Sequence, residues 1–303
     1  MREKARWQVD DLNLRLVAYF VSVIEEGHFG RASEKLFIST PALSQQIKRL
    51  EKQLGVELID RSAHPLQPTA AGRRFLPEAR AVLAAARRAV EAATSEIPPV
   101  RLGFMAASLV GPTRRFLELV RERRPRLEVA LVELQWADLA SAVRSGEVDA
   151  SILRPPVPDR SGLRLDVLCD EARVAVLPVG HALAGRDHVD LRDLDDEPHV
   201  RSDDADPEWV RWWACDPRPS GRPVVYGPSV RTMDEMLEVV ASGAAIVITS
   251  KFVDDTRRHE GVVFVPVRDA PRSAVCLCTR RDDLSAGTRA LIDGATEFRD
   301  HRI

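Results

Sequence analysis

The stretch from Ser39 to Gly55 constrains the fold more than any other part of this chain. Its apolar residues recur at the spacing of one helix face, and they are Leu43, Ile47, Leu50 and Leu54. The other face carries hydrogen-bonding and cationic groups, namely Ser44, Gln45, Lys48, Arg49 and Lys52. Ser39 or Thr40 can cap this helix, Pro41 suits its first turn, and Gly55 can end it. The pattern predicts an amphipathic helix with a polar, cationic outer face.

A second, shorter helix is expected directly before it, from Arg31 to Leu36, and only Phe37-Ile38-Ser39 connects the two. Two short helices joined by a tight turn form a helix-turn-helix, whose second helix enters the DNA major groove. Hydroxyls and amides read base edges there, whereas Lys and Arg neutralise phosphates. We therefore expect base contacts from Thr40, Pro41, Ser44 and Gln45, and phosphate contacts from Arg31, Lys48 and Arg49.

Four motifs between residues 27 and 72 together resemble the LysR-type transcriptional regulators, in family order and spacing. They are Gly27-His28-Phe29-Gly30-Arg31-Ala32-Ser33, Ser39-Thr40-Pro41-Ala42-Leu43-Ser44, Leu50 to Arg61, and Pro68-Thr69-Ala70-Ala71-Gly72. Two positions depart from the family pattern. Thr40 stands where the family usually has Gln, so the operator preference should differ, and Gly30 replaces the usual hydroxyl residue as the cap of the preceding helix.

The chain is expected to be α/β overall, with three parts. Residues 1–68 should form a winged helix-turn-helix that begins with a helix from Leu14 to Glu26, and residues 56–68 should form the wing. Arg61, His64 and Gln67 are candidate wing contacts with DNA, although Arg61 suits an ion pair within the domain equally well. Residues 69–97 should form one long helix with a stripe of Phe75, Leu76, Ala79, Val82, Leu83, Ala86 and Val90, which passes Pro77 without a break. The resemblance implies that this linker helix pairs antiparallel with a second copy, giving a homodimer or homotetramer.

Residues 98–303 change character, because short apolar runs alternate with helical patterns. Strands are expected at 100–104, 127–133, 148–153, 172–177, 223–226, 245–248, 262–265 and 274–279, with helices at 111–123, 138–145, 206–213 and 231–242. Such alternation indicates an α/β fold with mostly parallel sheet. The resemblance implies a periplasmic-binding-protein-like effector domain with two lobes, lobe one at 100–165 and 268–303 and lobe two at 166–267.

A small molecule is expected between these lobes, because ligands of open α/β sheets bind beyond the carboxyl ends of strands. Arg154 follows one such end and could hold a carboxylate, as could the helix start near Ser108. Relatives with the same Arg-Pro-Pro sequence tend to respond to small carboxylates, so an organic acid is the expected effector. The full candidate set is Ala107, Ser108, Gln135, Trp136, Arg154, Ser202, Thr232 and Thr249.

Three tryptophans, Trp209, Trp212 and Trp213, lie within five positions and are not typical of the family. They could line an aromatic pocket or a subunit interface, or simply pack beneath the second lobe.

Charge and composition agree with a DNA-binding regulator. The net charge is −2, but residues 1–96 hold 15 Lys and Arg against 12 Asp and Glu. No apolar run could span a bilayer and no secretory signal is seen, so the expected location is the cytoplasm, without a membrane partner. Double-stranded DNA, a small-molecule effector and further copies of the chain are the expected partners, and RNA polymerase is a possible further one.

No enzyme motif is found, and neither a cofactor nor a metal is expected. Two alternatives to the effector-gated regulator stay open. One is a cysteine-based redox sensor, for which Cys169 and Cys215 are the only well-separated pair, although peroxide sensors of the family space their cysteines more closely. The other is a solute-binding protein whose helical N-terminus contacts other proteins.

Overall fold

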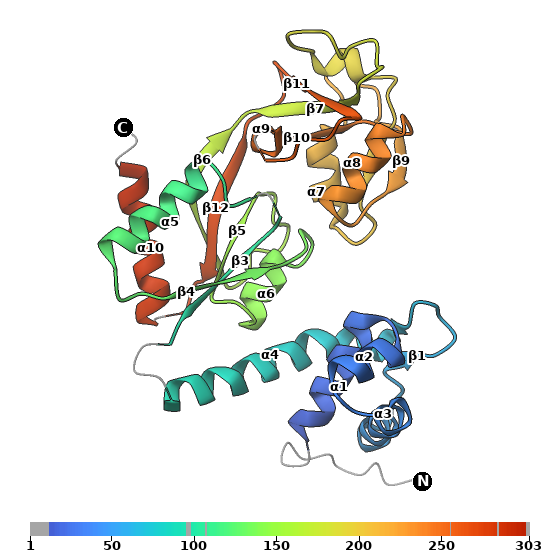
Figure 1. Ribbon diagram of the computed structural model, residues 1–303, viewed down its shortest axis with the longest axis vertical. Coiled ribbons are helices and arrows are strands. Elements are labelled where there is room, and N and C mark those ends of the chain that lie inside the picture. Colours follow the sequence, from blue (N-terminus) through green and yellow to red (C-terminus); the bar gives the residue numbers. More distant parts are fainter. Residues whose placement is uncertain (1–11, 95–97, 107, 255, 284, 301–303) are drawn as a thin grey trace. The chain divides into compact units, whose positions relative to one another are not determined.

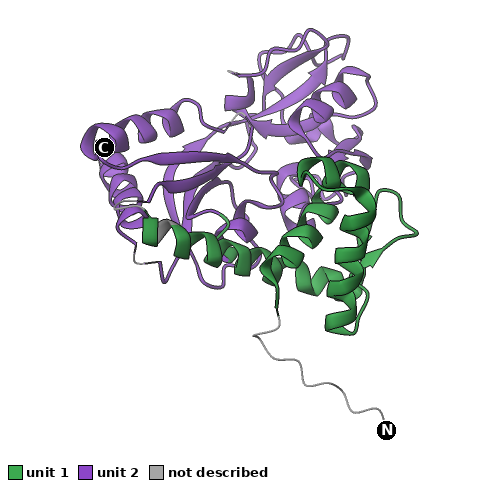
Figure 2. Ribbon diagram, turned by 60° about the horizontal axis from the view of Figure 1, so that its bottom comes forward, with its two compact units in different colours: residues 1–96, 145–147 green, residues 97–144, 148–303 purple. Residues whose placement is uncertain are grey.

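The computed structural model describes residues 12–94, 98–106, 108–254, 256–283 and 285–300. The chain divides into two compact units, residues 1–96 with 145–147, and residues 97–144 with 148–303 (Figure 2). Each unit has its own apolar clusters and is described separately below. Among the described residues, no helix is both long and apolar enough to cross a bilayer.

The first unit is a winged helix-turn-helix followed by a long helix (Figure 1). Its elements are α1 (Leu14–Glu26), α2 (Phe29–Lys35), α3 (Thr40–Leu54), β1 (Ile59–Asp60), β2 (Gln67–Pro68) and α4 (Ala70–Thr94). β1 and β2 pair antiparallel and form the wing. Helix α2 begins earlier than predicted, because the ring of His28, rather than Gly30, caps it: His28 Nδ1 accepts from Gly30 N at 2.9 Å.

The core of this unit forms where the apolar faces of three helices meet. Val17 and Phe20 of α1 and Leu43 and Ile47 of α3 are fully buried. Helix α4 runs through Pro77 as expected and contributes Phe75, whose ring lies 5.4 Å from that of Phe20. The first half of the α4 stripe therefore packs within its own domain, and the pairing with a second copy that the resemblance implies concerns the second half. Val82 and Val90, farther along, are 38% and 63% exposed.

The second unit contains two lobes. The first lobe has a five-stranded sheet in the order β4-β3-β5-β12-β6, formed by β4 (Val129–Glu133), β3 (Val100–Phe104), β5 (Ala150–Leu153), β12 (Ser273–Arg280) and β6 (Leu163–Glu171). Helices α5 (Pro112–Arg123) and α10 (Ala286–Asp300) share an apolar cluster with one face of this sheet, and α6 (Leu139–Ser145) shares one with the other. Cys276 and Cys278 lie buried on the α6 side, as expected for two residues of one strand face.

The second lobe is smaller and contains a three-stranded and a two-stranded sheet. The first has the order β10-β7-β11, from β10 (Val247–Ser250), β7 (Arg173–Pro178) and β11 (Val262–Pro266), and the second pairs β8 (His199–Arg201) with β9 (Tyr226–Ser229). Helices α7 (Pro207–Ala214), α8 (Met233–Ala241) and α9 (Lys251–Asp254) and the short η2 (Leu191–Leu194) complete it. The chain passes from the first lobe to the second at Ala172, later than the expected boundary at 165/166, and returns between β11 and β12.

The sheets are mixed, so the prediction of mostly parallel sheet is wrong. β3 pairs in parallel with β4 and β5, but β12 pairs antiparallel with β5 and β6, and β7 pairs antiparallel with both its neighbours. The reason is that two strands cross between the lobes in opposite directions, which alternation along the sequence does not reveal. The prediction also omitted β6, β8, α9 and α10.

Candidate functional site

Helix α3 presents the polar face that the sequence predicted. Ser39 caps it, because the Ser39 side chain accepts from Ala42 N at 3.4 Å, and Gly55 ends it with φ of 71°. Leu43, Ile47 and Leu50 are fully buried, which fixes the rotation of the helix. The outward-facing predicted contacts are Thr40, Pro41, Gln45, Lys48 and Arg49, all exposed, and Ser44, which is half-buried.

The hydroxyl of Thr40 belongs to a short hydrogen-bond chain. Ser33 Oγ donates to Gly30 O at 2.8 Å, and Ser33 Oγ and Thr40 Oγ1 are 2.8 Å apart. A serine hydroxyl has a single hydrogen, so Thr40 must be the donor in the second bond. The lone pairs of Thr40 Oγ1 therefore remain for an outside donor, and the side chain can only accept from DNA.

Two of the predicted DNA-contacting arginines have partners within the domain. Arg61 Nη2 donates to Glu51 Oε2 at 3.0 Å, and the Arg61 guanidinium lies 5.4 Å from the centre of the Phe29 ring. The other oxygen of Glu51 accepts from Leu58 N at 3.0 Å and Ile59 N at 3.2 Å. This buried carboxylate ties the start of the wing to α3. Arg31 donates to the carbonyl of Glu26 while its side chain stays largely exposed.

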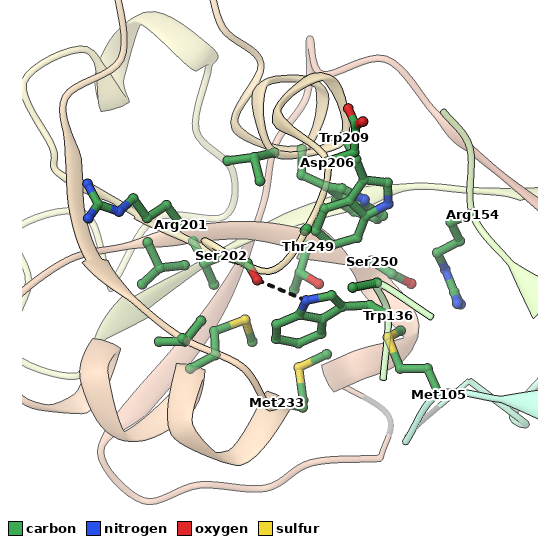
Figure 3. A pocket seen from close by; sticks show the side chains of 18 of the residues that line it. Met105, Trp136, Arg154, Arg201, Ser202, Asp206, Trp209, Met233, Thr249 and Ser250 are labelled. Atoms are coloured by element: carbon green, nitrogen blue, oxygen red, sulfur yellow. Dashed lines mark hydrogen bonds between the residues drawn. The ribbon is translucent and has the colours of Figure 1, made fainter. Parts of the chain in front are cut away.

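A cavity of about 150 Å³ lies between the two lobes of the second unit (Figure 3). The first lobe contributes Met105, Trp136, Leu139, Leu153 and Arg154. The second contributes His199, Ser202, Asp206, Trp209, Trp213, Met233, Met236, Thr249 and Ser250, among others. Four predicted effector residues therefore line the cavity, namely Trp136, Arg154, Ser202 and Thr249.

Three of the remaining predicted effector residues, Ser108, Gln135 and Thr232, do not line it. Ser108 is buried in the loop before α5, and its hydroxyl has no hydrogen-bond partner among the described residues. Gln135 is exposed, and Thr232 caps α8, since its hydroxyl accepts from Glu235 N at 3.1 Å. Ala107 lies outside the described residues.

The cation expected to bind a carboxylate is already paired. Arg154 Nε donates to Glu171 Oε1 at 2.5 Å and Arg154 Nη2 donates to Glu171 Oε2 at 3.2 Å. The side chains are 6% and 1% exposed, so water screens this pair little. Glu171 closes β6, and the sheet order places β12 between it and β5, the strand that precedes Arg154.

Aromatic rings from both lobes meet in the cavity. The indoles of Trp136 and Trp209 stack with centroids 6.1 Å apart, and those of Trp209 and Trp213 lie 5.8 Å apart. Trp136 Nε1 donates to Ser202 Oγ at 3.1 Å, so a first-lobe indole reaches a second-lobe hydroxyl. Trp212 instead stacks on the guanidinium of Arg173, which lies 3.5 Å from its ring centre.

His199 is a structural member of the cavity wall. Burial lowers its pKa to about 4, and the nearby cations Arg218 and Arg173 act in the same direction. The neutral ring joins two segments: His199 Nδ1 lies 2.6 Å from Val200 O, and His199 Nε2 accepts from Ile248 N at 2.9 Å. Because both ring nitrogens are occupied, His199 offers a ligand neither a charge nor a free hydrogen bond.

Sequence reasoning missed the lining residues Met105, Met233 and Met236. It had left Trp209 and Trp213 open between an aromatic pocket, a subunit interface and plain packing, and both line the cavity. The spacing of Trp209 and Trp213, four positions apart on one helix, was the available signal, because such residues share a face. Among the described residues, no cluster of three His, Cys, Asp or Glu is placed to hold a metal, and burial raises the pKa of Cys276 and of Cys278 to about 12.

Comparison with known proteins covers both units. Residues 14–73 match the helix-turn-helix of bacterial regulatory proteins of the lysR family, and residues 94–299 match the LysR substrate binding domain. The Hca operon transcriptional activator HcaR of Escherichia coli is 30% identical over 292 residues, which cover 93% of this chain and 96% of that protein. The regulator ShiR of Corynebacterium glutamicum is 37% identical over 62% of this chain and 65% of its own length. The matches to the first relatives thus span slightly less than two thirds of those proteins.

Solved structures agree at the level of the fold. The crystal structure of CbnR, a LysR family transcriptional regulator, aligns with 95% of this chain and 99% of its own, with a TM-score of 0.65 and 18% identity. This likeness concerns architecture alone.

Proposed function

We propose that this chain, which belongs to the LysR family of bacterial transcriptional regulators, binds a specific duplex through helix α3 and changes its binding in response to a small organic effector. The observation that carries the DNA part is the outer face of α3. There Thr40, Gln45, Lys48 and Arg49 are exposed beside a fully buried apolar face.

The side chains on this face divide by chemistry. Gln45 can both donate and accept, which suits adenine in the major groove, and the Lys48 and Arg49 cations suit phosphates. Thr40 can only accept, so it suits a base that presents a donor there, adenine through N6 or cytosine through N4. We expect Arg61 mainly to position the wing, because Glu51 holds it.

The second half of the α4 stripe supports a homodimer, which could pair again into a tetramer. Val82 and Val90 are exposed on a helix whose earlier apolar residues are covered within the domain. Pairing with the same helix of a second copy would remove them from water. Two recognition helices would then address half-sites about 34–36 Å apart on one face of the duplex.

The effector is proposed to bind in the cavity that Trp136 and Trp209 line. A ligand there contacts both lobes and can favour one arrangement of them over another, which regulation requires, because a ligand with equal affinity for both arrangements shifts neither. An organic acid is one candidate, since Arg154 lines the cavity, but its carboxylate would have to displace Glu171 from that side chain.

The proposed function is tested by fluorescence anisotropy with a labelled duplex from the region upstream of the chain's own coding sequence. We expect tight binding that an unlabelled copy displaces better than a scrambled duplex, and an affinity that falls as salt rises. Equal competition by the two duplexes would show that the chain is not a sequence-specific regulator.

A further inference from the structure

We propose that the pocket takes a neutral, planar aromatic molecule that carries a hydrogen-bond donor, and not a carboxylate. This inference deepens the proposed function, because it assigns the effector its chemical class. It rests on the walls of the cavity, on the indole already inside it, and on the partners of its charged side chains.

Aromatic rings and methionine thioethers form much of the cavity wall. Figure 3 shows Trp136 with Trp209 on one side and with Met105 and Met233 on the other. Indole faces attract flat rings, and methionine sulfur makes favourable contacts with aromatic edges. A cavity of about 150 Å³ is the size that holds one benzene-sized ring in an apolar site.

The contacts of Trp136 show that the second lobe can bind a flat ring that carries a hydrogen-bond donor. Its indole enters from the first lobe, stacks on Trp209 and donates its single N–H to Ser202 Oγ at 3.1 Å. Thr249 and Ser250 lie near it and add two hydroxyls to the wall (Figure 3). A ligand with a flat ring and one O–H or N–H group would make contacts of the same kind beside Trp136.

The charges in the wall disfavour an acid. Of the three basic side chains that line the cavity in the described part of the chain, His199 is neutral and Arg154 is held by both oxygens of Glu171. The third, Arg201, pairs with Asp203 at 2.9 Å and points away from Trp136 (Figure 3).

Asp206, the one acid in the wall among the described residues, adds no cation. It is exposed and caps α7, where it accepts from Glu208 N at 2.8 Å. A carboxylate entering this pocket would therefore meet no uncommitted buried cation, and burying an unpaired charge is costly.

The experiment uses two ligands with the same ring, benzyl alcohol and benzoate, and measures their binding to the full chain by calorimetry. We expect benzyl alcohol to bind at least about tenfold more tightly than benzoate. In Glu171→Gln, whose Arg154 is no longer neutralised, benzoate should bind at least about tenfold more tightly than in the unaltered chain. The double variant Arg154→Gln/Glu171→Gln, in which both charges are gone, should keep benzyl alcohol binding and gain no benzoate binding. Circular dichroism checks that each variant is folded.

Benzoate binding as tightly as benzyl alcohol to the unaltered chain would overturn the proposal, and so would failure of benzyl alcohol to bind. Trp209→Ala should weaken benzyl alcohol binding. If binding is unchanged in this variant, the ligand lies elsewhere and the proposal is overturned. The duplex measurement does not depend on these ligands. Failure of the ligand experiment would therefore leave the proposed DNA recognition intact, and failure of the duplex experiment would leave the proposed ligand class intact.

Discussion

Thr40 donates its hydroxyl hydrogen to Ser33 Oγ, 2.8 Å away, because the hydrogen of Ser33 is already given to the carbonyl of Gly30. A residue of α2 thereby sets the hydrogen-bonding role of the first residue of α3. The bond is internal to the helix-turn-helix, so it exists before any duplex arrives.

Removal of this constraint should broaden base preference. In Ser33→Ala the Thr40 hydroxyl can rotate and either donate or accept, so we expect weaker discrimination between bases at the one position that Thr40 contacts. Thr40→Val should lose that discrimination altogether. Selection of bound duplexes from a randomised pool measures both, and an unchanged preference in both variants would show that Thr40 does not read a base.

Glu51 should contribute strongly to the stability of the DNA-binding domain. Glu51→Ala leaves the buried amides of Leu58 and Ile59 and the Arg61 guanidinium without their acceptor, so we expect a loss of about 2–4 kcal/mol in the free energy of unfolding. Urea unfolding followed by circular dichroism measures it. The control is Glu57→Ala, an exposed glutamate of the same segment, which should change stability by less than about 0.5 kcal/mol.

Phe37 occupies a position that local geometry assigns to glycine. Its φ is 54°, and the bonds Phe37 N to Glu34 O and Ile38 N to Ser33 O close α2 in the manner that favours a left-handed residue. Its side chain is 95% exposed, so packing does not offset the strain. Phe37→Gly should stabilise the chain by about 0.5–1 kcal/mol, whereas Phe37→Ala, which keeps the strain, should change little. Destabilisation by glycine in urea unfolding would contradict this reading.

Charges on the exposed half of the α4 stripe should separate the proposed dimer. Sedimentation of Val82→Asp/Val90→Asp is expected to give a monomer with weakened duplex binding, because two half-sites are no longer held by one particle. Val179→Asp/Val225→Asp is the matched control, since these valines of the second lobe are 55% and 57% exposed. A dimeric Val82→Asp/Val90→Asp chain would exclude α4 as the interface.

Local patterns in the sequence were enough to predict α1, α3 and α4 of the first unit. The periodicity of Leu43, Ile47 and Leu50 places α3 correctly, because a buried helix face repeats every three or four residues. Helix α10 was missed, since Gly287 and Gly294 weaken its helical pattern. A side chain at position 294 would come within 2.7 Å of Val120, so glycine is needed there for close packing on α5.

The pocket was predicted only in part, because its chemistry depends on contacts between distant segments. The sequence places a cation at the end of β5 but cannot show that Glu171, on the edge strand β6, neutralises it. Likewise, Trp136 was a candidate on its own, whereas its stacking on Trp209 and its bond to Ser202 exist only once the lobes meet.

Competition binding with Gln45→Ala and Lys48→Ala tests whether α3 reads DNA sequence. We expect Gln45→Ala to bind the upstream and scrambled duplexes with similar affinity. Lys48→Ala should weaken both while keeping the preference, and should reduce the slope of log affinity against log salt by about one. If Gln45→Ala keeps the full preference while Lys48→Ala loses it, or if neither variant differs from the unaltered chain, α3 does not recognise DNA in the way proposed.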